Sequence, residues 1–184
     1  MKIACLGWGS LVWDPRNLPI RPEWFKDGPF APVEFRRKSS DGRITLVIDR
    51  SAARVQLLWA LMLPTDLPTA RTALCDRECI PHSHCGRDID SWQTGESAPD
   101  VIQSLPAWAQ AHEVDAVIWT ALLPKFDQVR SPSVRQIKNY LQGLTGCKRD
   151  KAEQYVRCAP RQIKTEYRRQ IEAEIGWSYR KRWP

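Results

Sequence analysis

The sequence predicts an α+β fold in which a mixed or mainly antiparallel β-sheet curls toward a small barrel and helices pack outside it. Three observations support this prediction. Apolar runs of strand length recur through the first two thirds of the chain, an Asp-Gly turn joins two alternating segments, and helical patterns fill the last third. A set of strands followed by a set of helices is typical of the α+β class.

The first strand and a hairpin are expected near the N-terminus. Residues 3–6 form an apolar run that is typical of a buried strand and that stops at a glycine. Residues 33–36 and 43–49 flank a turn sequence at 39–42. Because this turn contains an Asp-Gly pair between alternating segments, it favours a β-hairpin.

The middle of the chain adds two strands and a helix. Residues 55–63 are nearly all apolar, which is typical of a strand buried on both faces. Thr65 or Asp66 is expected to cap a helix that runs to about Arg77. Residues 115–122 form another apolar run, which we interpret as a strand.

A long polar segment separates these elements. Residues 79–99 contain Pro, Gly, Ser and charged residues and predict a long loop. A loop of this length inside a compact domain is usually functional or mobile, so it is our candidate for a lid. Short helices are expected around residues 104–113.

The last third is expected to be helical. The expected helices cover residues 132–144, about 148–157 and about 161–175. The final helix carries an apolar residue at every fourth position, at Ile163, Tyr167, Ile171 and Ile175. This spacing predicts one apolar stripe that docks on the rest of the protein, and Gly176 is placed to end the helix.

Length and charge predict one domain with a basic end. We expect a single domain over residues 1–184 with a basic helical C-terminal extension at about 148–184. The chain carries a net charge of +7, and from Lys148 onward eleven Lys and Arg face five Asp and Glu. We interpret this end as a solvated helical surface. Nucleic-acid binding is the alternative, although the chain shows no nucleic-acid motif.

The sequence predicts a cytoplasmic protein. No apolar stretch approaches the roughly 20 residues that a membrane-spanning helix needs. The N-terminus lacks the basic start and long apolar segment of a secretory signal. In the cytoplasm we expect the six cysteines to be reduced thiols.

The turn after the first strand raises the main functional question. The stretch at 6–13 reads Leu-Gly-Trp-Gly-Ser-Leu-Val-Trp. A strand that ends in Gly-Trp-Gly-Ser presents several backbone N–H groups where little side chain obstructs approach, and such a nest binds carboxylates or carbonyl oxygens. The alternative is that both glycines simply form a tight turn.

This stretch, continued by Asp14-Pro15, resembles the Gly-Tyr-Gly-Ser-Leu-aliphatic-Trp loop of the gamma-glutamylcyclotransferase superfamily. It is most similar to the glutathione-degrading ChaC-like branch. The resemblance continues in order over roughly residues 1–145, through the hairpin, the strand at 55–61 and a helix that ends at 74–78. The sequence at 74–78, Leu-Cys-Asp-Arg-Glu, is similar to the family's Leu-x-x-Arg-Glu.

The C-terminal part of the resemblance is looser, and four departures stand out. Pro132-Ser133 followed by Gly143 is similar to the Pro-Ser-x-x-Tyr helix of the wider superfamily. The departures are Trp8 at the usual tyrosine, Gln56-Leu57 without the strand glycine, Cys79-Ile80-Pro81 in place of a glycine-rich turn, and Gln136 at the second tyrosine. We expect these departures to affect which substrate is bound more than they affect the fold.

The resemblance implies an enzyme that releases 5-oxoproline from a γ-glutamyl peptide or amine, glutathione being one candidate. In this reaction the α-amine of the substrate attacks its own γ-carbonyl, so the enzyme mainly folds the substrate and moves protons. Glu78 is the implied general acid/base. The implied substrate-binding residues are Gly7, Trp8, Gly9, Ser10 and Leu11. No cofactor is implied.

Other residues offer weaker alternatives. Zinc-type ligands gather within eleven residues at Cys75, Cys79, His82, His84 and Cys85. They lack paired C-x2-C knuckles, so we expect no metal, and no group is placed to orient a histidine beside a cysteine nucleophile.

Two further carboxylates and one further function were considered. Glu34 lies in a strand expected to alternate outward, and Glu23 lies in a Pro-rich segment, so both are weaker candidates for the acid/base. The alternative function is a non-catalytic module on the same fold that binds a small ligand, a nucleic acid or a protein.

Overall fold

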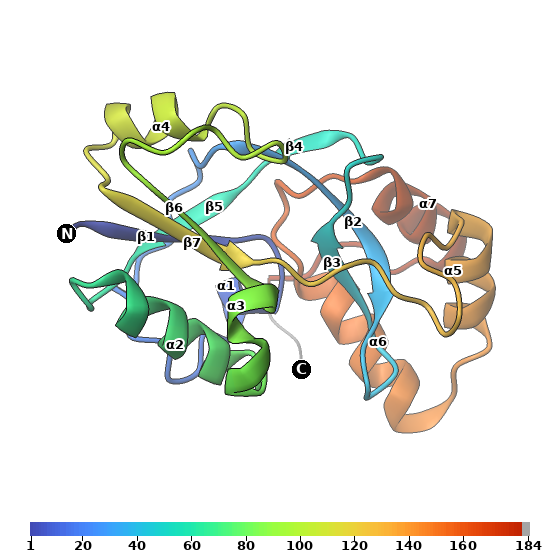
Figure 1. Cartoon of the computed structure of the whole chain (residues 1–184). Coiled ribbons are helices and arrows are strands. Elements are labelled where there is room, and N and C mark those ends of the chain that lie inside the picture. Colours follow the sequence, from blue (N-terminus) through green and yellow to red (C-terminus); the bar gives the residue numbers. More distant parts are fainter. Residues whose placement is uncertain (182–184) are drawn as a thin grey trace. The chain divides into compact units, whose positions relative to one another are not determined.

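The computed structural model describes residues 1–181 (Figure 1). These residues form two compact units, each assembled from segments that are distant in sequence. The first unit comprises Met1–Gly7, Asp14–Ala31 and Gln56–Leu122. The second comprises Trp8–Trp13, Pro32–Val55 and the described residues from Leu123 onward. The expectation of a single domain over 1–184 stays a prediction, and its last three residues lie outside the described part.

The first unit contains a four-stranded mixed sheet with the order β5-β1-β7-β6. Its strands are β1 (Ile3–Gly7), β5 (Leu58–Leu61), β6 (Ile89–Gln93) and β7 (Ala116–Thr120). Strand β1 pairs antiparallel with β5 and parallel with β7, and all five of its residues are buried. An apolar run without alternation suits such a central position, because both faces of the strand are covered.

Strand β6 was not expected. It lies inside the segment 79–99 that the sequence predicts to be a loop, and it pairs antiparallel with β7 over its whole length. Only Ile89 and Trp92 are buried in β6, so the strand has little apolar signal. The same segment also contains a 3-10 helix, η1 (His82–His84), and the short helix α3 (Cys85–Asp88).

Helix α2 (Leu67–Arg77) confirms the expected helix after the buried strand. Asp66 is its N-cap, because the Asp66 side chain accepts a hydrogen bond from the Thr69 amide. Helix α2 contacts β6 and β7, and α4 (Leu105–Ala111) confirms the short helix expected around 104–113.

The second unit is built on the predicted hairpin. Strands β2 (Phe30–Lys38) and β3 (Ile44–Ile48) pair antiparallel, and β4 (Arg54–Gln56) joins β2 on its other edge. Gly42 has φ +87°, the left-handed conformation that the turn requires and that glycine adopts without strain. The Asp-Gly prediction is therefore confirmed.

The helices of the second unit begin at capping residues. They are α1 (Ser10–Trp13), α5 (Val134–Gln142), α6 (Gly146–Cys158) and α7 (Glu166–Ile175). Ser133 and Gln136 form a capping box at α5, and Thr165 caps α7 through the amide of Arg168. Gly176 ends α7 with φ +78°. Helix α7 is shorter than expected because Thr165 starts it four residues after the predicted boundary.

The α+β class is confirmed, but the residues from 1 to 181 form no closed barrel. Their strands belong to one four-stranded and one three-stranded sheet. The first sheet ends at β5 and β6 and the second at β3 and β4, so neither sheet closes on itself. In the same described part, no helix is long and apolar enough to cross a membrane.

A buried carboxylate docks α7 in the second unit. Glu34 is only 3% exposed, which corrects the expectation that it points outward from its strand. Its carboxylate accepts hydrogen bonds from the Phe35 amide at 2.9 Å, the Tyr167 amide at 3.2 Å and the Thr165 hydroxyl. Of the predicted stripe, Ile163 and Ile171 are fully buried, although Ile163 precedes α7.

Burial raises the pKa of Glu34 above its ordinary value near 4.5, and the three hydrogen bonds offset this only in part. The folded protein therefore binds the Glu34 proton more tightly than the unfolded chain does. Stability from this group is present below pH 4.5 and is lost as the pH rises through the raised pKa.

We expect the urea midpoint of the wild type, relative to that of Glu34→Gln, to fall as the pH increases from 4.5 to 7. The amide that replaces the Glu34 carboxylate in the variant does not titrate, so the difference between the two urea midpoints reports the protonation of Glu34 alone. The exposed Glu23 supplies the control, because Glu23→Gln should leave the pH dependence unchanged. If the urea midpoint of the wild type, relative to that of Glu34→Gln, rises with pH instead, the raised pKa of Glu34 is wrong.

Candidate functional site

Gly7 is part of the sheet and not part of the turn. It is the last residue of β1, where it is buried opposite Leu58 of β5. The turn therefore begins at Trp8, one residue later than the sequence predicts. Gly7 belongs to the first unit, whereas Trp8, Gly9 and the residues after them up to Trp13 belong to the second.

Trp8 anchors the turn within the second unit. Its side chain is 4% exposed, and its indole Nε1 donates a hydrogen bond to the Leu46 carbonyl at 3.1 Å. Because this N–H is occupied, Trp8 does not offer a donor to a ligand in place of the usual tyrosine hydroxyl. Its role in this structure is packing.

Gly9 is required by close packing. A β-carbon on Gly9 would lie 2.3 Å from the Tyr155 hydroxyl oxygen, too close for any side chain. The same hydroxyl accepts a hydrogen bond from the Leu46 amide at 3.3 Å, and Trp13 packs edge-on against the Tyr155 ring at 5.3 Å. Leu46 thus binds Trp8 through its carbonyl and Tyr155 through its amide.

Ser10 and Leu11 start the single turn of α1. The Gly9 carbonyl accepts a hydrogen bond from the Val12 amide at 3.0 Å, which closes the turn. The first N–H groups of a helical turn have no partner within that turn, so this geometry directs backbone donors toward the N-terminal end of α1. Leu11 is buried, and Ser10 is half-buried.

Glu78 lies in the first unit at the C-terminal end of α2. Its amide donates to the Leu74 carbonyl at 3.1 Å, so the backbone is fixed by the last turn of the helix. The carboxylate is 20% exposed and forms an ion pair with Arg77 at 2.7 Å. Arg77 is 3% exposed, and it also donates to the Asp14 carbonyl.

Arg77 therefore links Asp14 to Glu78, which lies 64 residues later in the chain. Asp14 follows the turn in the sequence, and Glu78 ends the second segment that carries the family resemblance. Arg16 strengthens this link, because it donates to the Arg77 carbonyl at 3.2 Å. All four residues belong to the first unit.

The charge of Glu78 acts on a thiol in the first unit. Burial raises the pKa of Cys5 in β1 above its ordinary value, and the negative charge of Glu78 raises it further. The prediction that one ligand touches both Glu78 and the turn at 9–11 stays a prediction.

The cysteine and histidine side chains of this segment are spread out: in the part of the chain that the structure describes, no three His, Cys, Asp or Glu side chains converge as they would around a metal ion. Cys75 is buried, and burial raises its pKa to about 12. His82 is exposed and pairs with Asp76 at 2.6 Å. Cys79 is also exposed, and its sulfur accepts a hydrogen bond from Arg16 at 3.6 Å.

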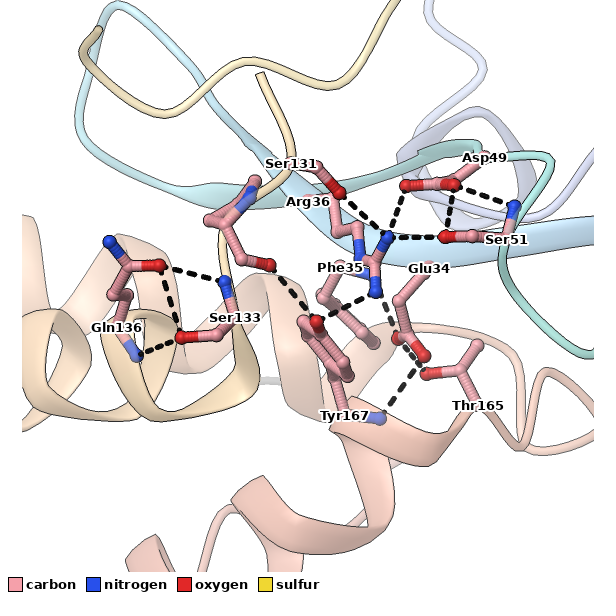
Figure 2. Close-up of polar contacts among 11 residues, drawn as sticks. Glu34, Phe35, Arg36, Asp49, Ser51, Ser131, Ser133, Gln136, Thr165 and Tyr167 are labelled. Carbon is pink, nitrogen blue, oxygen red and sulfur yellow. Dashed lines mark hydrogen bonds and ion pairs between the residues drawn. The ribbon is translucent and has the colours of Figure 1, made fainter. Parts of the chain in front are cut away.

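The sequence analysis missed a polar cluster in the second unit (Figure 2). Arg36 donates to Asp49 at 2.7 Å, to Ser51 at 2.6 Å and to Tyr167 at 2.8 Å. Burial alone would raise the pKa of Asp49, but hydrogen bonds from Ser51 and Arg36 outweigh it and lower the pKa. The cluster could not be assigned from the sequence, because Arg36 lies in β2, Asp49 follows β3 and Tyr167 lies 131 residues after Arg36.

This cluster is structural, because its groups bind one another. Arg36 also donates to Ser131 at 3.1 Å, and Tyr167 donates to the Pro132 carbonyl at 2.9 Å. Figure 2 shows the Arg36 guanidinium between Asp49 and Tyr167, so it joins the hairpin to α7.

A scan of protein-family models and searches of curated proteins and of solved structures found no match to this chain. The resemblance to the gamma-glutamylcyclotransferase superfamily therefore stays a prediction. It rests on the turn at 7–15 and on the helix end at 74–78.

Packing at Gly9 gives a test of the turn. We expect Gly9→Ala to lower the free energy of unfolding by about 1–3 kcal/mol, because the added methyl group collides with the Tyr155 hydroxyl. The double variant Gly9→Ala/Tyr155→Phe removes the colliding oxygen and should recover part of the loss. Urea denaturation of the four proteins of this cycle measures the coupling.

Gly86 provides the matched control. A β-carbon there would meet nothing within 4 Å, so Gly86→Ala should leave the urea midpoint unchanged or raise it. If Gly9→Ala were as stable as Gly86→Ala, the close approach of Tyr155 to the turn would be wrong.

Proposed function

We propose that this protein is a γ-glutamyl cyclotransferase-type enzyme that releases 5-oxoproline from a γ-glutamyl peptide or amine. One observation carries the proposal. Within the first unit, buried Arg77 holds Glu78 on one side and the Asp14 carbonyl on the other, and Asp14 directly follows the turn that resembles the superfamily in the sequence. A surface glutamate without such a partner would not favour catalysis.

The reaction balances within one substrate molecule. The α-amine attacks the γ-carbonyl carbon, the C–N bond to the leaving group breaks, and 5-oxoproline forms with release of a free amine. Glu78 takes a proton from the α-ammonium group and returns a proton to the leaving nitrogen. Because both reacting groups belong to one molecule, the enzyme needs no cofactor for this chemistry.

Arg77 serves as the positioning residue in this proposal. A charge-assisted hydrogen bond at 2.7 Å restrains the Glu78 carboxylate, while partial exposure leaves that carboxylate open to a substrate. The Asp14 carbonyl in turn restrains Arg77. A general base acts efficiently only when it is held in the productive orientation.

The turn would bind the substrate through its backbone. The Trp8 indole is occupied by Leu46, so the donors proposed for a substrate carboxylate or carbonyl are the amides of Gly9, Ser10 and Leu11. Backbone amides recognise the charge of the γ-glutamyl group and not the leaving group, which fits an enzyme for several γ-glutamyl compounds.

We expect Glu78→Gln to lower the rate of 5-oxoproline release by roughly 10²–10⁴-fold, because the amide keeps the shape of the side chain but cannot carry the proton. The assay measures 5-oxoproline from glutathione, γ-glutamyl amino acids and γ-glutamyl amines. Melting temperature and substrate binding should change little.

Asp76→Asn is the matched control. Asp76 is an exposed carboxylate two residues earlier on the same helix, and its partner is His82. Loss of the Asp76 charge should leave the rate of 5-oxoproline release unchanged. A wild-type rate in Glu78→Gln would refute Glu78 as the acid/base, and tight γ-glutamyl binding without any product would favour the non-catalytic module.

A further inference from the structure

The two units carry opposite charge. The first unit contains seven Lys and Arg against twelve Asp and Glu, a formal charge of −5. The described residues of the second unit contain twenty against nine, a formal charge of +11. The basicity of the chain therefore extends well beyond the C-terminal tail, and the second unit as a whole attracts anions.

Part of this charge surrounds two half-buried aromatic rings at the tip of the hairpin. Phe126 and Tyr140 pack edge to face with ring centroids 5.4 Å apart. The Lys38 ammonium lies 4.5 Å from the Tyr140 centroid and 5.5 Å from the Phe126 centroid. Tyr140 donates to the Gly42 carbonyl at 2.7 Å, which fixes the ring beside the turn.

Two exposed lysines border the same rings. The chain at Lys125 runs beside β2, where the Lys38 amide donates to the Lys125 carbonyl at 2.7 Å. Lys148, in the first turn of α6, lies beside Gly42. A β-carbon added to Gly42 would lie 3.8 Å from the Cδ atom of Lys148. Figure 1 shows the hairpin tip beside α6. We call this surface the hairpin-tip patch; it consists of Lys38, Arg43, Lys125, Phe126, Tyr140 and Lys148.

The patch keeps an excess of positive charge after its ion pairs are counted. Asp127 neutralises Lys38 at 2.8 Å, and Asp41 neutralises Arg43 at 2.9 Å. Among residues 1–181, Lys125 and Lys148 have no acidic partner. Two cations are therefore available for an external anion.

We infer that the hairpin-tip patch is a binding surface for single-stranded nucleic acid. Exposed lysines can follow a phosphate backbone, and partly exposed aromatic rings beside them can stack on unpaired bases. A duplex hides its base faces, and an anionic membrane has none, so the rings favour a single strand over either. The inference is independent of Glu78, which belongs to the other unit.

The full-length protein can be titrated against a fluorescent oligo(dT) of about 12 nucleotides, within the roughly 4–16 nucleotides of one such site. We expect binding that weakens as salt increases from about 50 to 200 mM. The double variant Lys125→Gln/Lys148→Gln should weaken binding about tenfold or more at the lower salt concentration. It should also reduce the slope of log affinity against log salt by about 1.4, because two phosphate contacts are lost.

A second double variant separates the patch from general positive charge. Arg161 and Lys164 are exposed cations of the same unit that lie outside the patch. Arg161→Gln/Lys164→Gln removes the same charge and should change affinity by about twofold or less. If the two double variants lose the same affinity for oligo(dT), the hairpin-tip patch is not the binding site.

Stacking is tested at Phe126. Phe126→Ala should weaken binding about fivefold or more, whereas Phe126→Trp keeps a ring and should bind as well as the wild type. Circular dichroism confirms that each variant is folded. Tighter binding to the duplex of the same length or to phosphatidylserine vesicles, or no binding to oligo(dT) at about 50 mM salt, would overturn the inference.

Discussion

The carboxylate of Glu34 is the constraint on which the second unit depends. It is buried in the middle of β2, and its acceptors must be satisfied, because an unpaired buried charge is costly. Thr165 and the Tyr167 amide satisfy them, so the start of α7 can dock in only one place. The neighbouring Arg36 then joins Asp49 to Tyr167 and fixes the hairpin against the same helix.

A buried arginine has the corresponding role in the first unit. Arg77 joins Glu78 to the Asp14 carbonyl, although 63 residues separate Arg77 from Asp14. The chain thus uses an arginine in each unit to connect distant segments, half-buried Arg36 in the second and buried Arg77 in the first. In the second unit the arginine is consumed by structural partners, whereas in the first the carboxylate partner remains partly exposed and is the group proposed to act on a substrate.

Short-range signals in the sequence predicted much of the local structure. The Asp-Gly pair predicted the hairpin, Asp66 the start of α2, and Gly176 the end of α7. The apolar runs predicted β1 and β7, since burial on both faces leaves no polar positions in a strand. The run at 55–63 was predicted as one strand, but the structure divides it between β4 of one sheet and β5 of the other. The candidate residues at 7–11 and at Glu78 were likewise chosen from short motifs.

The sequence by itself determined the α+β class from the order of its patterns. It also determined the Asp-Gly turn, the N-cap of α2 and the end of α7, because each of these depends on residues within a few positions of one another. Only the tertiary structure decided that Glu34 is buried, that residues 89–93 form a strand and that Gly9 lies against Tyr155. Each of these depends on partners more than 20 residues away: Glu34 on α7, β6 on β7, and Gly9 on α6. A residue's own identity does not specify which distant backbone or hydroxyl will cover it.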